Sequence, residues 1–149
     1  MAKILIIDDE KSIRSTLREI LEYEKYEVEE AEDGEIGLDL IKKNEYDAVL
    51  CDIKMPKLDG IEVLEKSHNV GKDTPFIMIS AHGTIETAVE GMKIGAFDYI
   101  LKPANFEELL DKITEAKKSK TAQEERIQKA ESHALLMESR KGGKSPFPS

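Results

Sequence analysis

The chain has 149 residues, of which 36% are charged and 40% are hydrophobic, and its formal net charge is −9. This length suits one compact domain with a tail, and the composition excludes wholesale disorder. No apolar run approaches the ~20 residues of a membrane span, and acids follow the first apolar run too early for a signal peptide. Cys51 is the only cysteine, so no internal disulfide forms. We therefore expect a cytoplasmic protein, and its negative charge disfavours direct binding of nucleic acid or membranes.

Short apolar runs alternate with amphipathic stretches. In chain order, we expect a strand at 3–7, a helix at 12–24, an edge strand at 26–31, a helix that carries Ile36, Leu40 and Ile41, a strand at 48–51, a helix at 60–66, a strand at 76–79, a helix at 84–94, a strand at 97–101 and a helix after Asn105. Gly95 is typical of a residue that ends a helix. Asn105, with Glu108 three residues later, indicates an N-cap and a capping box.

Strict alternation of five strands and five helices predicts an α/β protein with a doubly wound parallel sheet and helices on both faces. Periodicity does not give the strand order. A five-stranded sheet of this kind commonly has the flavodoxin-like order 2-1-3-4-5, which we expect here.

Charge divides the chain near residues 118–120. The first 118 residues have a net charge of −11, whereas residues 119–149 have a net charge of +2. We predict a globular domain at 1–118, a helical linker or tail at 119–141, and a disordered tail or expression remnant at 142–149. Alternating steps of three and four in the tail fall on apolar residues, except that Lys120 and Gln123 occupy the positions between Ala116 and Ile127: Ile113, Ala116, Ile127, Ala130, Ala134 and Met137. This spacing favours a helix that pairs with a second chain, and the alternative is a solvated, frayed linker.

Polar residues follow four of the five expected strands. Asp8 and Asp9 follow the first strand, Asp52 the third, Ser80 the fourth and Lys102 the fifth. Ligands of open α/β sheets bind outside the carboxyl ends of the strands, so the expected strand order brings these side chains together. Taken singly, Asp8 and Asp9 could cap the next helix, Ser80 could be a loop hydroxyl, and Lys102 could be a solvated charge.

Three carboxylates in one small site need a counter-charge. At separations of ~4–6 Å they repel one another by several kcal/mol. Mg²⁺ offsets such repulsion because it prefers oxygen ligands, takes one or two carboxylates and keeps several waters. A magnesium-loaded acidic cluster beside a lysine is suited to bind a dianionic phosphoryl group.

Four segments resemble the receiver domain of two-component response regulators. They are ILIIDDE at 4–10, AVLCDIKMPKLDG at 48–60, IMISA at 77–81 and FDYILKP at 97–103. The resemblance covers about residues 1–118. It implies a phosphoacceptor that takes a phosphoryl group from a sensor histidine kinase or phosphotransfer protein, and not an enzyme that turns over a separate substrate.

The resemblance also implies roles for individual residues. Asp52 would be the phosphoacceptor, and Mg²⁺ would be held by Asp9, Asp52 and the backbone carbonyl of Lys54, with Asp8 acting mainly through water. Lys102 and Ser80 would each contact a phosphoryl oxygen.

Further family positions concern the lifetime of the phosphorylated state and the switch. Lys54 and His82 occupy the two positions that tune hydrolysis of the acyl phosphate. Tyr99 would be the switch aromatic, which turns inward when Ser80 moves toward the phosphate, and Lys102–Pro103 would be a cis peptide. The face formed by the helix at 84–94, the strand at 97–101 and the last helix would be the output surface and a possible homodimer interface together with the linker.

Two segments, at 80–89 and 95–99, look like receivers of nitrogen-regulation-type transcriptional activators. Those proteins continue into an ATPase and a DNA-binding domain. This sequence contains no phosphate-binding Gly-x-x-x-x-Gly-Lys-Ser/Thr loop, so we expect either a fragment of such an activator or a stand-alone receiver.

Two rival functions remain open. A magnesium-dependent phosphohydrolase of the haloacid-dehalogenase type usually has Asp-x-Asp at the nucleophile, but Lys54 stands at the second position here. A flavodoxin-like binder of flavin or nucleotide would need a phosphate loop after the first strand, where the acidic run would repel phosphate.

Overall fold

The computed structural model describes residues 1–81 and 85–139. Strands and helices alternate along these residues in the following order: β1 (Lys3–Ile7), α1 (Lys11–Tyr23), β2 (Glu27–Ala31), α2 (Gly34–Lys43), β3 (Ala48–Asp52), α3 (Gly60–Asn69), β4 (Phe76–Ser80), α4 (Ile85–Ile94), β5 (Asp98–Leu101) and α5 (Phe106–Ser139). The five strands form one parallel sheet in the order β2-β1-β3-β4-β5. The predicted fold class and strand order are therefore confirmed.

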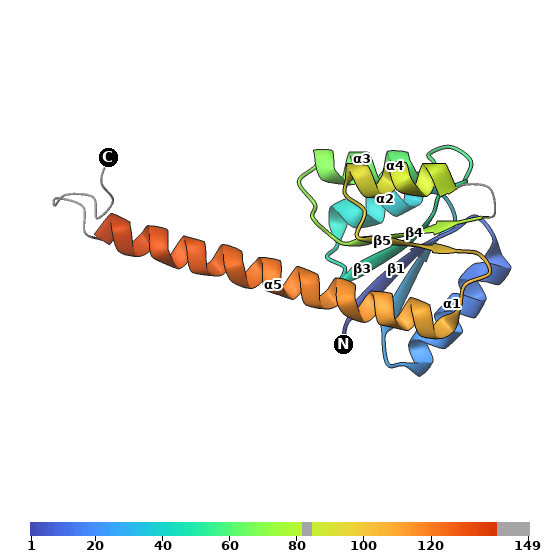
Figure 1. The fold of residues 1–149 in the computed structure, drawn as a ribbon, viewed down its shortest axis with the longest axis horizontal. Helices are drawn as coiled ribbons and strands as arrows, with labels where there is room; N and C mark the ends of the chain where they lie inside the picture. Colours follow the sequence, from blue (N-terminus) through green and yellow to red (C-terminus); the bar gives the residue numbers. More distant parts are fainter. Residues whose placement is uncertain (82–84, 140–149) are drawn as a thin grey trace.

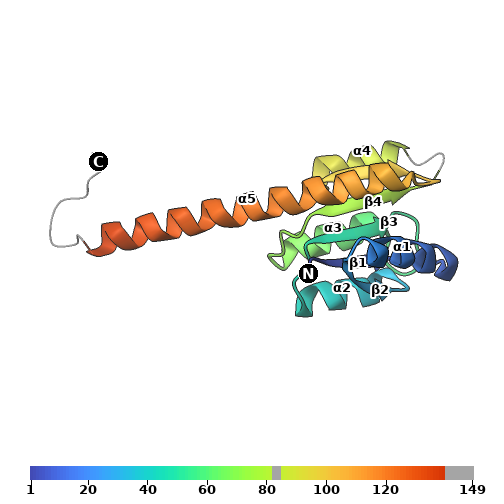
Figure 2. The same cartoon turned by 90° about the horizontal axis from the view of Figure 1, so that it is seen from below.

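Helices cover both faces of the sheet. Figures 1 and 2 show α1 and α5 on one face, and α2, α3 and α4 on the other. The alternation of side chains along β1 explains this arrangement. Ile4 and Ile6 pack in the core beneath α1 and α5, while Leu5 and Ile7 pack in the core on the opposite face. Because both faces are apolar, the run from Ile4 to Ile7 contains no polar residue.

Hydrogen-bonded caps set several helix boundaries. Gly95 has φ +124° and follows α4, and the Gly95 and Ala96 amides donate to the carbonyls of Met92 and Gly91, respectively. This is a Schellman motif, and the prediction for Gly95 is confirmed. The predicted N-cap at Asn105 is also confirmed, because its Oδ1 accepts from the Glu108 amide at 3.1 Å.

The buried face of α2 is set by the residue at which the helix begins. Ile36 is apolar but 38% exposed. The helix begins at Gly34, with the Asp33 carboxylate accepting from the Ile36 amide. This start places a set spaced by three and four residues against the core: Gly34, Gly37, Leu38 and Ile41. Ile36 falls outside that stripe.

The last helix continues without a break across residues 118–120 and extends beyond the body of the molecule (Figure 1). Lys120 ties it to the body: its Nζ donates to the Tyr46 carbonyl and lies 4.0 Å from a Glu45 carboxylate oxygen. The division of function between 1–118 and 119–141 stays a prediction, and the predicted tail at 142–149 lies outside the described residues. None of the described helices is both long enough and apolar enough to cross a membrane.

Candidate functional site

Three strands bring the two most buried acids and one lysine together at the carboxyl edge of the sheet. Asp52 is the last residue of β3, Asp8 directly follows β1, and Lys102 directly follows β5. Lys102 Nζ lies 3.5 Å from Asp52 Oδ2 and 3.7 Å from Asp8 Oδ2. The Asp52 residue is 4% exposed and Asp8 is fully buried. One ammonium group therefore bridges two carboxylates that are almost removed from water.

Burial dominates the electrostatics of both carboxylates. Loss of solvent, followed by repulsion from the nearby Asp8 carboxylate, raises the pKa of Asp52 to about 6, although Lys102 opposes both effects. The pKa of Asp8 is also raised, chiefly by burial, although the Glu10 amide and Lys102 stabilise its charged form. The pocket therefore contains more negative charge than its single lysine offsets.

A second group of acids extends this pocket toward solvent. Asp8, Asp9 and Glu10 each place a carboxylate oxygen within 4.8 Å of the others. Asp8 Oδ1 accepts from the Glu10 amide at 2.8 Å, whereas Asp8 Oδ2 is buried without a hydrogen-bond partner among the described residues. A buried oxygen of this kind beside exposed carboxylates fits a hard divalent cation. Glu10 was not among the predicted site residues, although the uninterrupted acidic run was its signal.

The alternative in which these acids cap α1 is wrong. The N-cap residue of α1 is Glu10, no side chain makes the cap hydrogen bond, and the first turn contains no acid. Asp8 instead bonds to the backbone of its own turn. The Asp8 and Asp9 carboxylates therefore do not act as the N-cap of α1.

Ser80 lies at the neighbouring strand end. It is fully buried as the last residue of β4, and its carbonyl accepts from the Lys102 amide at 2.8 Å. Its hydroxyl lies 3.4 Å from the Ala81 carbonyl, to which it donates. His82, predicted to tune the phosphate lifetime, lies outside the described residues. The Lys102–Pro103 bond is cis, as the resemblance implied.

The loop after β3 closes tightly over the strand end. Lys54 is exposed on this loop, and the Gly60 amide donates to the Ile53 carbonyl at 2.8 Å. A Cβ added at Gly60 would lie 2.5 Å from the Asp52 carbonyl oxygen, which is too close for any side chain. Asp59 caps α3 in a reciprocal capping box with Glu62. The residues at 59–60 thus shape the loop by turn chemistry.

Tyr99 lies on β5, half-buried against the core beneath α2, α3 and α4. Lys112 of α5 donates to the Tyr99 carbonyl at 2.7 Å, and its Nζ also lies 5.5 Å from the centre of the Tyr99 ring and 3.1 Å from the Asp98 carboxylate. These contacts join β5 to α5 beside the aromatic ring. The switching role of Tyr99 stays a prediction.

Comparisons with known proteins agree with this fold and site. The response regulator receiver domain family matches residues 4–114. The response regulator MprA of Mycobacterium sp. (strain KMS) is 41% identical over 111 residues, which are 74% of this chain and 48% of that protein. The chain thus spans about half the length of the curated relatives it matches.

Solved structures show the same similarity. A response regulator receiver domain protein from Clostridium thermocellum is 35% identical with a TM-score of 0.79, covering 82% of this chain and 98% of that one. NtrX from Brucella abortus, in complex with ADP, is 34% identical with a TM-score of 0.80, covering 85% of this chain and 30% of that one.

The chain therefore belongs to the response regulator receiver domain family of two-component systems. This is a family of signalling domains that generally bind Mg²⁺ at an acidic pocket and act with histidine kinases or phosphotransfer proteins. In this chain the acidic side chains at 8–10 are clustered at the end of β1.

Proposed function

We propose that Asp52 is the phosphoacceptor of this receiver domain and takes a phosphoryl group from a histidine kinase or a phosphotransfer protein. The observation that carries the proposal is the placement of the Asp52 carboxylate. It is buried at the end of a central strand, 3.5 Å from Lys102 Nζ and in the field of the Asp8 carboxylate. Such a site combines a nucleophile with a fixed positive charge for the oxygens of the transferred group.

The transfer itself needs one bond to form and one to break. An Asp52 oxygen attacks phosphorus as the bond from phosphorus to the donor imidazole nitrogen breaks, and the bonding electrons leave with that nitrogen. The products are an acyl phosphate on Asp52 and, with a proton on the other ring nitrogen of the donor, a neutral imidazole. Lys102 contacts one phosphoryl oxygen and Ser80 another, so that they stabilise the charge of the transferred group.

A divalent cation fits the acids beside Asp52, because the buried Asp8 Oδ2 has no hydrogen-bond partner among the described residues. We propose that Asp9, Asp52 and the Lys54 carbonyl hold Mg²⁺, with Asp8 acting through water. Bound there, the ion would neutralise carboxylate repulsion and the charge of the phosphoryl group.

The output surface would be the face formed by α4, β5 and α5. Tyr99 and Ser80 would form the switch, and the contacts of Lys112 with β5 connect that switch to α5. Lys54 and His82 would set the lifetime of the acyl phosphate.

Because MprA and NtrX are response regulators in which this domain is only part of the protein, we propose that the output is transcriptional and the location cytoplasmic. A stand-alone receiver that relays phosphate is the second candidate, because the chain covers 98% of the similar receiver from Clostridium thermocellum.

We also propose that the α5 extension contributes to a homodimer. Residues 119–139 are helical, and the exposed side chains there include Ala130 and Leu135, the latter 70% exposed. Apolar side chains on a helix that leaves the body can be buried by a second copy of the same helix.

The central test is labelling of the full chain with acetyl phosphate and Mg²⁺, followed by intact mass. We expect the gain of one phosphoryl group per chain, with no gain in Asp52→Asn because the amide is not nucleophilic. Asp59→Asn is the matched control, since asparagine also caps helices and α3 should be retained.

Three results would contradict the proposal. Labelling that persists in Asp52→Asn would place the acceptor elsewhere. Labelling that is independent of Mg²⁺ would remove the role of the cation. Steady release of phosphate from a phosphomonoester would favour the phosphohydrolase.

A further inference from the structure

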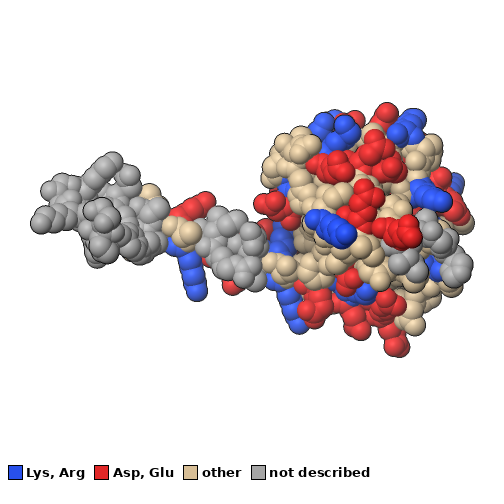
Figure 3. All heavy atoms as spheres, turned by 45° about the horizontal axis from the view of Figure 1, so that its top comes forward, with Lys and Arg blue, Asp and Glu red and all other residues tan. Residues whose placement is uncertain are grey.

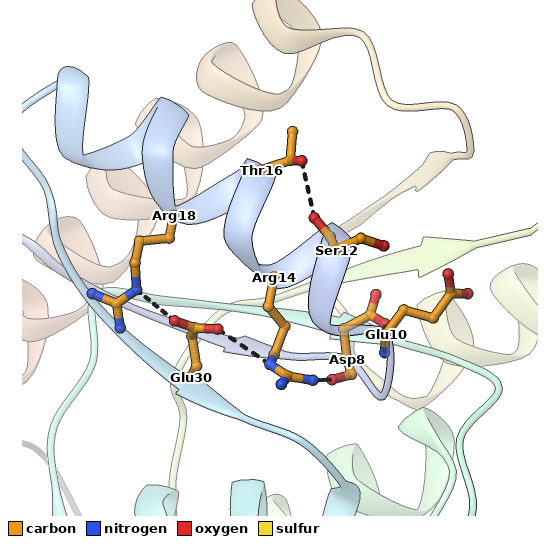
Figure 4. Close-up of polar contacts among 7 residues, drawn as sticks. All are labelled: Asp8, Glu10, Ser12, Arg14, Thr16, Arg18 and Glu30. Carbon is orange, nitrogen blue, oxygen red and sulfur yellow. Dashed lines mark hydrogen bonds and ion pairs between the residues drawn. The ribbon is translucent and has the colours of Figure 1, made fainter.

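Arg14 of α1 reaches back to the turn that carries the acidic cluster. Its Nη1 donates to the Asp8 carbonyl at 2.7 Å, and its Nε donates to Glu30 Oε1 of the edge strand β2 at 3.1 Å (Figure 4). The Arg14 side chain is only 12% exposed. A guanidinium group directs its donors along fixed, diverging directions, so one arginine can hold both acceptors at once, which a lysine cannot do.

The Arg14 side chain is itself held in place. The Glu30 carboxylate lies between two guanidinium groups, with Arg14 on one oxygen and Arg18 on the other (Figure 4). Arg18 also lies 3.4 Å from Glu22, one helical turn later. Of these two arginines, only Arg14 hydrogen-bonds to the Asp8 turn among the described residues. Arg18 thus resembles Arg14 in charge and in its contact with Glu30, but does not bond to that turn.

The contact with the Asp8 carbonyl controls the next residue through the geometry of the peptide bond. Because the peptide unit is planar, the direction of the Asp8 carbonyl fixes the direction of the Asp9 N–H and the point from which the Asp9 backbone departs. The Asp8 amide is fixed as well, since it donates to the Ala31 carbonyl at 3.1 Å. With both ends of Asp8 held, the Asp8 and Asp9 carboxylates converge within 4.8 Å despite their repulsion.

We propose that Arg14 is a positioning residue for the cation site: it orients the Asp8–Asp9 peptide unit so that the carboxylates face a divalent cation. This inference rests on the proposed function. Arg14 does not contact the cation or the phosphoryl group in this arrangement. It acts through the Asp8 carbonyl, and Glu30 with Arg18 keeps it in the required orientation.

The sign of the effect on Mg²⁺ affinity separates this role from simple electrostatics. Removal of a positive charge near an acidic cluster should strengthen cation binding by Coulomb's law. Loss of a positioning contact should weaken it, and outer contacts of metal ligands typically change affinity by about tenfold or more. We therefore expect Arg14→Gln to raise the Mg²⁺ dissociation constant about tenfold.

The experiment is a titration of the full chain with Mg²⁺ alone, followed by the NMR amide signals of residues 8–10 and 52–54. Arg18→Gln is the matched control, because it removes the same charge and one contact to Glu30 but leaves the Asp8 carbonyl bonded. We expect it to bind Mg²⁺ as the wild type does. Arg14→Lys should bind weakly although its charge is kept, and it replaces Arg14→Gln if that variant does not fold. Hydrogen exchange of the Asp9 amide should be faster in both Arg14 variants than in Arg18→Gln.

Unchanged or tighter Mg²⁺ binding in the Arg14 variants would overturn the proposal. An equal loss of affinity in Arg18→Gln would do the same, because it would indicate a general effect of Glu30. A wild-type chain that binds Mg²⁺ but is not labelled on Asp52 would overturn the phosphoacceptor proposal and leave the Arg14 comparison intact. If the wild-type chain is labelled on Asp52 but Arg14→Gln binds Mg²⁺ as tightly as the wild type, the Arg14 proposal is overturned and the phosphoacceptor proposal stands.

Discussion

The Asp52 side chain illustrates the opposition between function and stability at a single residue. A carboxylate at the carboxyl end of β3 can act as a nucleophile only if it is ionised, yet burial and Asp8 both favour its protonated form. At neutral pH the carboxylate is mostly ionised, because its pKa of about 6 lies below that pH. The folded protein therefore holds a charge that its surroundings disfavour when no cation is bound.

We expect the metal-free protein to become more stable as the pH falls from about 7 to about 5, by about 1 kcal/mol. The folded state takes up a proton at Asp52 near pH 6, whereas the unfolded chain does so only near its ordinary pKa of 3.8. Protonation therefore favours the folded state within this window. Urea unfolding with a chelator at both pH values measures the effect.

Asp52→Asn should weaken this pH dependence and be more stable than the wild type at pH 7, because it removes the buried charge. Comparison with the variant cancels the contribution of the other titrating groups. Equal slopes in both proteins would show that Asp52 carries no such penalty.

At the scale of elements, the start of α3 determines the shape of the loop after Asp52. The capping box of Asp59 and Glu62 fixes the first turn, and Gly60 then lies against the backbone of the strand end. The neighbouring atoms are the Asp52 carbonyl oxygen and the Ile53 Cα, which cannot yield as a flexible side chain can. The helix start, the loop and the phosphoacceptor position are thus coupled through one close backbone approach.

Gly60→Ala should lower the free energy of unfolding by about 1–3 kcal/mol. It should also slow labelling of Asp52, because the new Cβ must displace the strand end. Gly71→Ala is the control: Gly71 has φ +79°, so alanine is strained there by about 1 kcal/mol, but nothing lies within 4 Å of the added Cβ. If both variants were labelled at the same rate, the coupling of Gly60 to the site would be refuted.

The whole molecule consists of a two-faced α/β body and a helix that continues beyond it (Figure 2). Acidic and basic side chains are interspersed on the face of the body seen in Figure 3. The body therefore offers mixed charge on that face, whereas the extension of α5 exposes apolar side chains such as Leu135. This contrast favours the extension as a contact between two copies of the chain.

Ala130→Glu should reduce self-association, because it places a charge within the apolar spacing of the tail. Gln128→Glu adds the same charge two residues away and should leave association unchanged. Sedimentation with and without acetyl phosphate and Mg²⁺ compares the two variants with the wild type. A wild-type chain that stays monomeric under both conditions would contradict the dimer.

The sequence predicted the fold well because its signals were local and mutually consistent. The apolar run from Ile4 to Ile7 favoured a strand buried on both faces, and Gly95 marked the end of α4. The sequence did not show which face of α2 is buried, because the helix starts with a cap at Asp33 and that start sets which residues lie inward. One apolar residue does not define a face when the first residue of the helix is uncertain.

The candidate site could be predicted in part for the same reason. The ends of β1, β3 and β5 marked Asp8, Asp52 and Lys102. The structure brings the two carboxylates within 3.7 Å of Lys102 Nζ. Arg14 and Glu30 could not be found in this way, because their contact joins residues 16 apart on a helix and an edge strand. Such a pair has no motif in the sequence and becomes visible only once α1 packs beside β2.

Lys120 holds α5 at the end of the sheet opposite Asp52, through the Tyr46 carbonyl just ahead of β3. From this pivot to Ser139 the helix acts as a stiff lever arm of about 28 Å. A tilt of only about 5° at the pivot would move its far end by about 2–3 Å. A small rearrangement within the body can thus become a displacement of whole side-chain dimensions at the tip, without any part of the lever having to unfold.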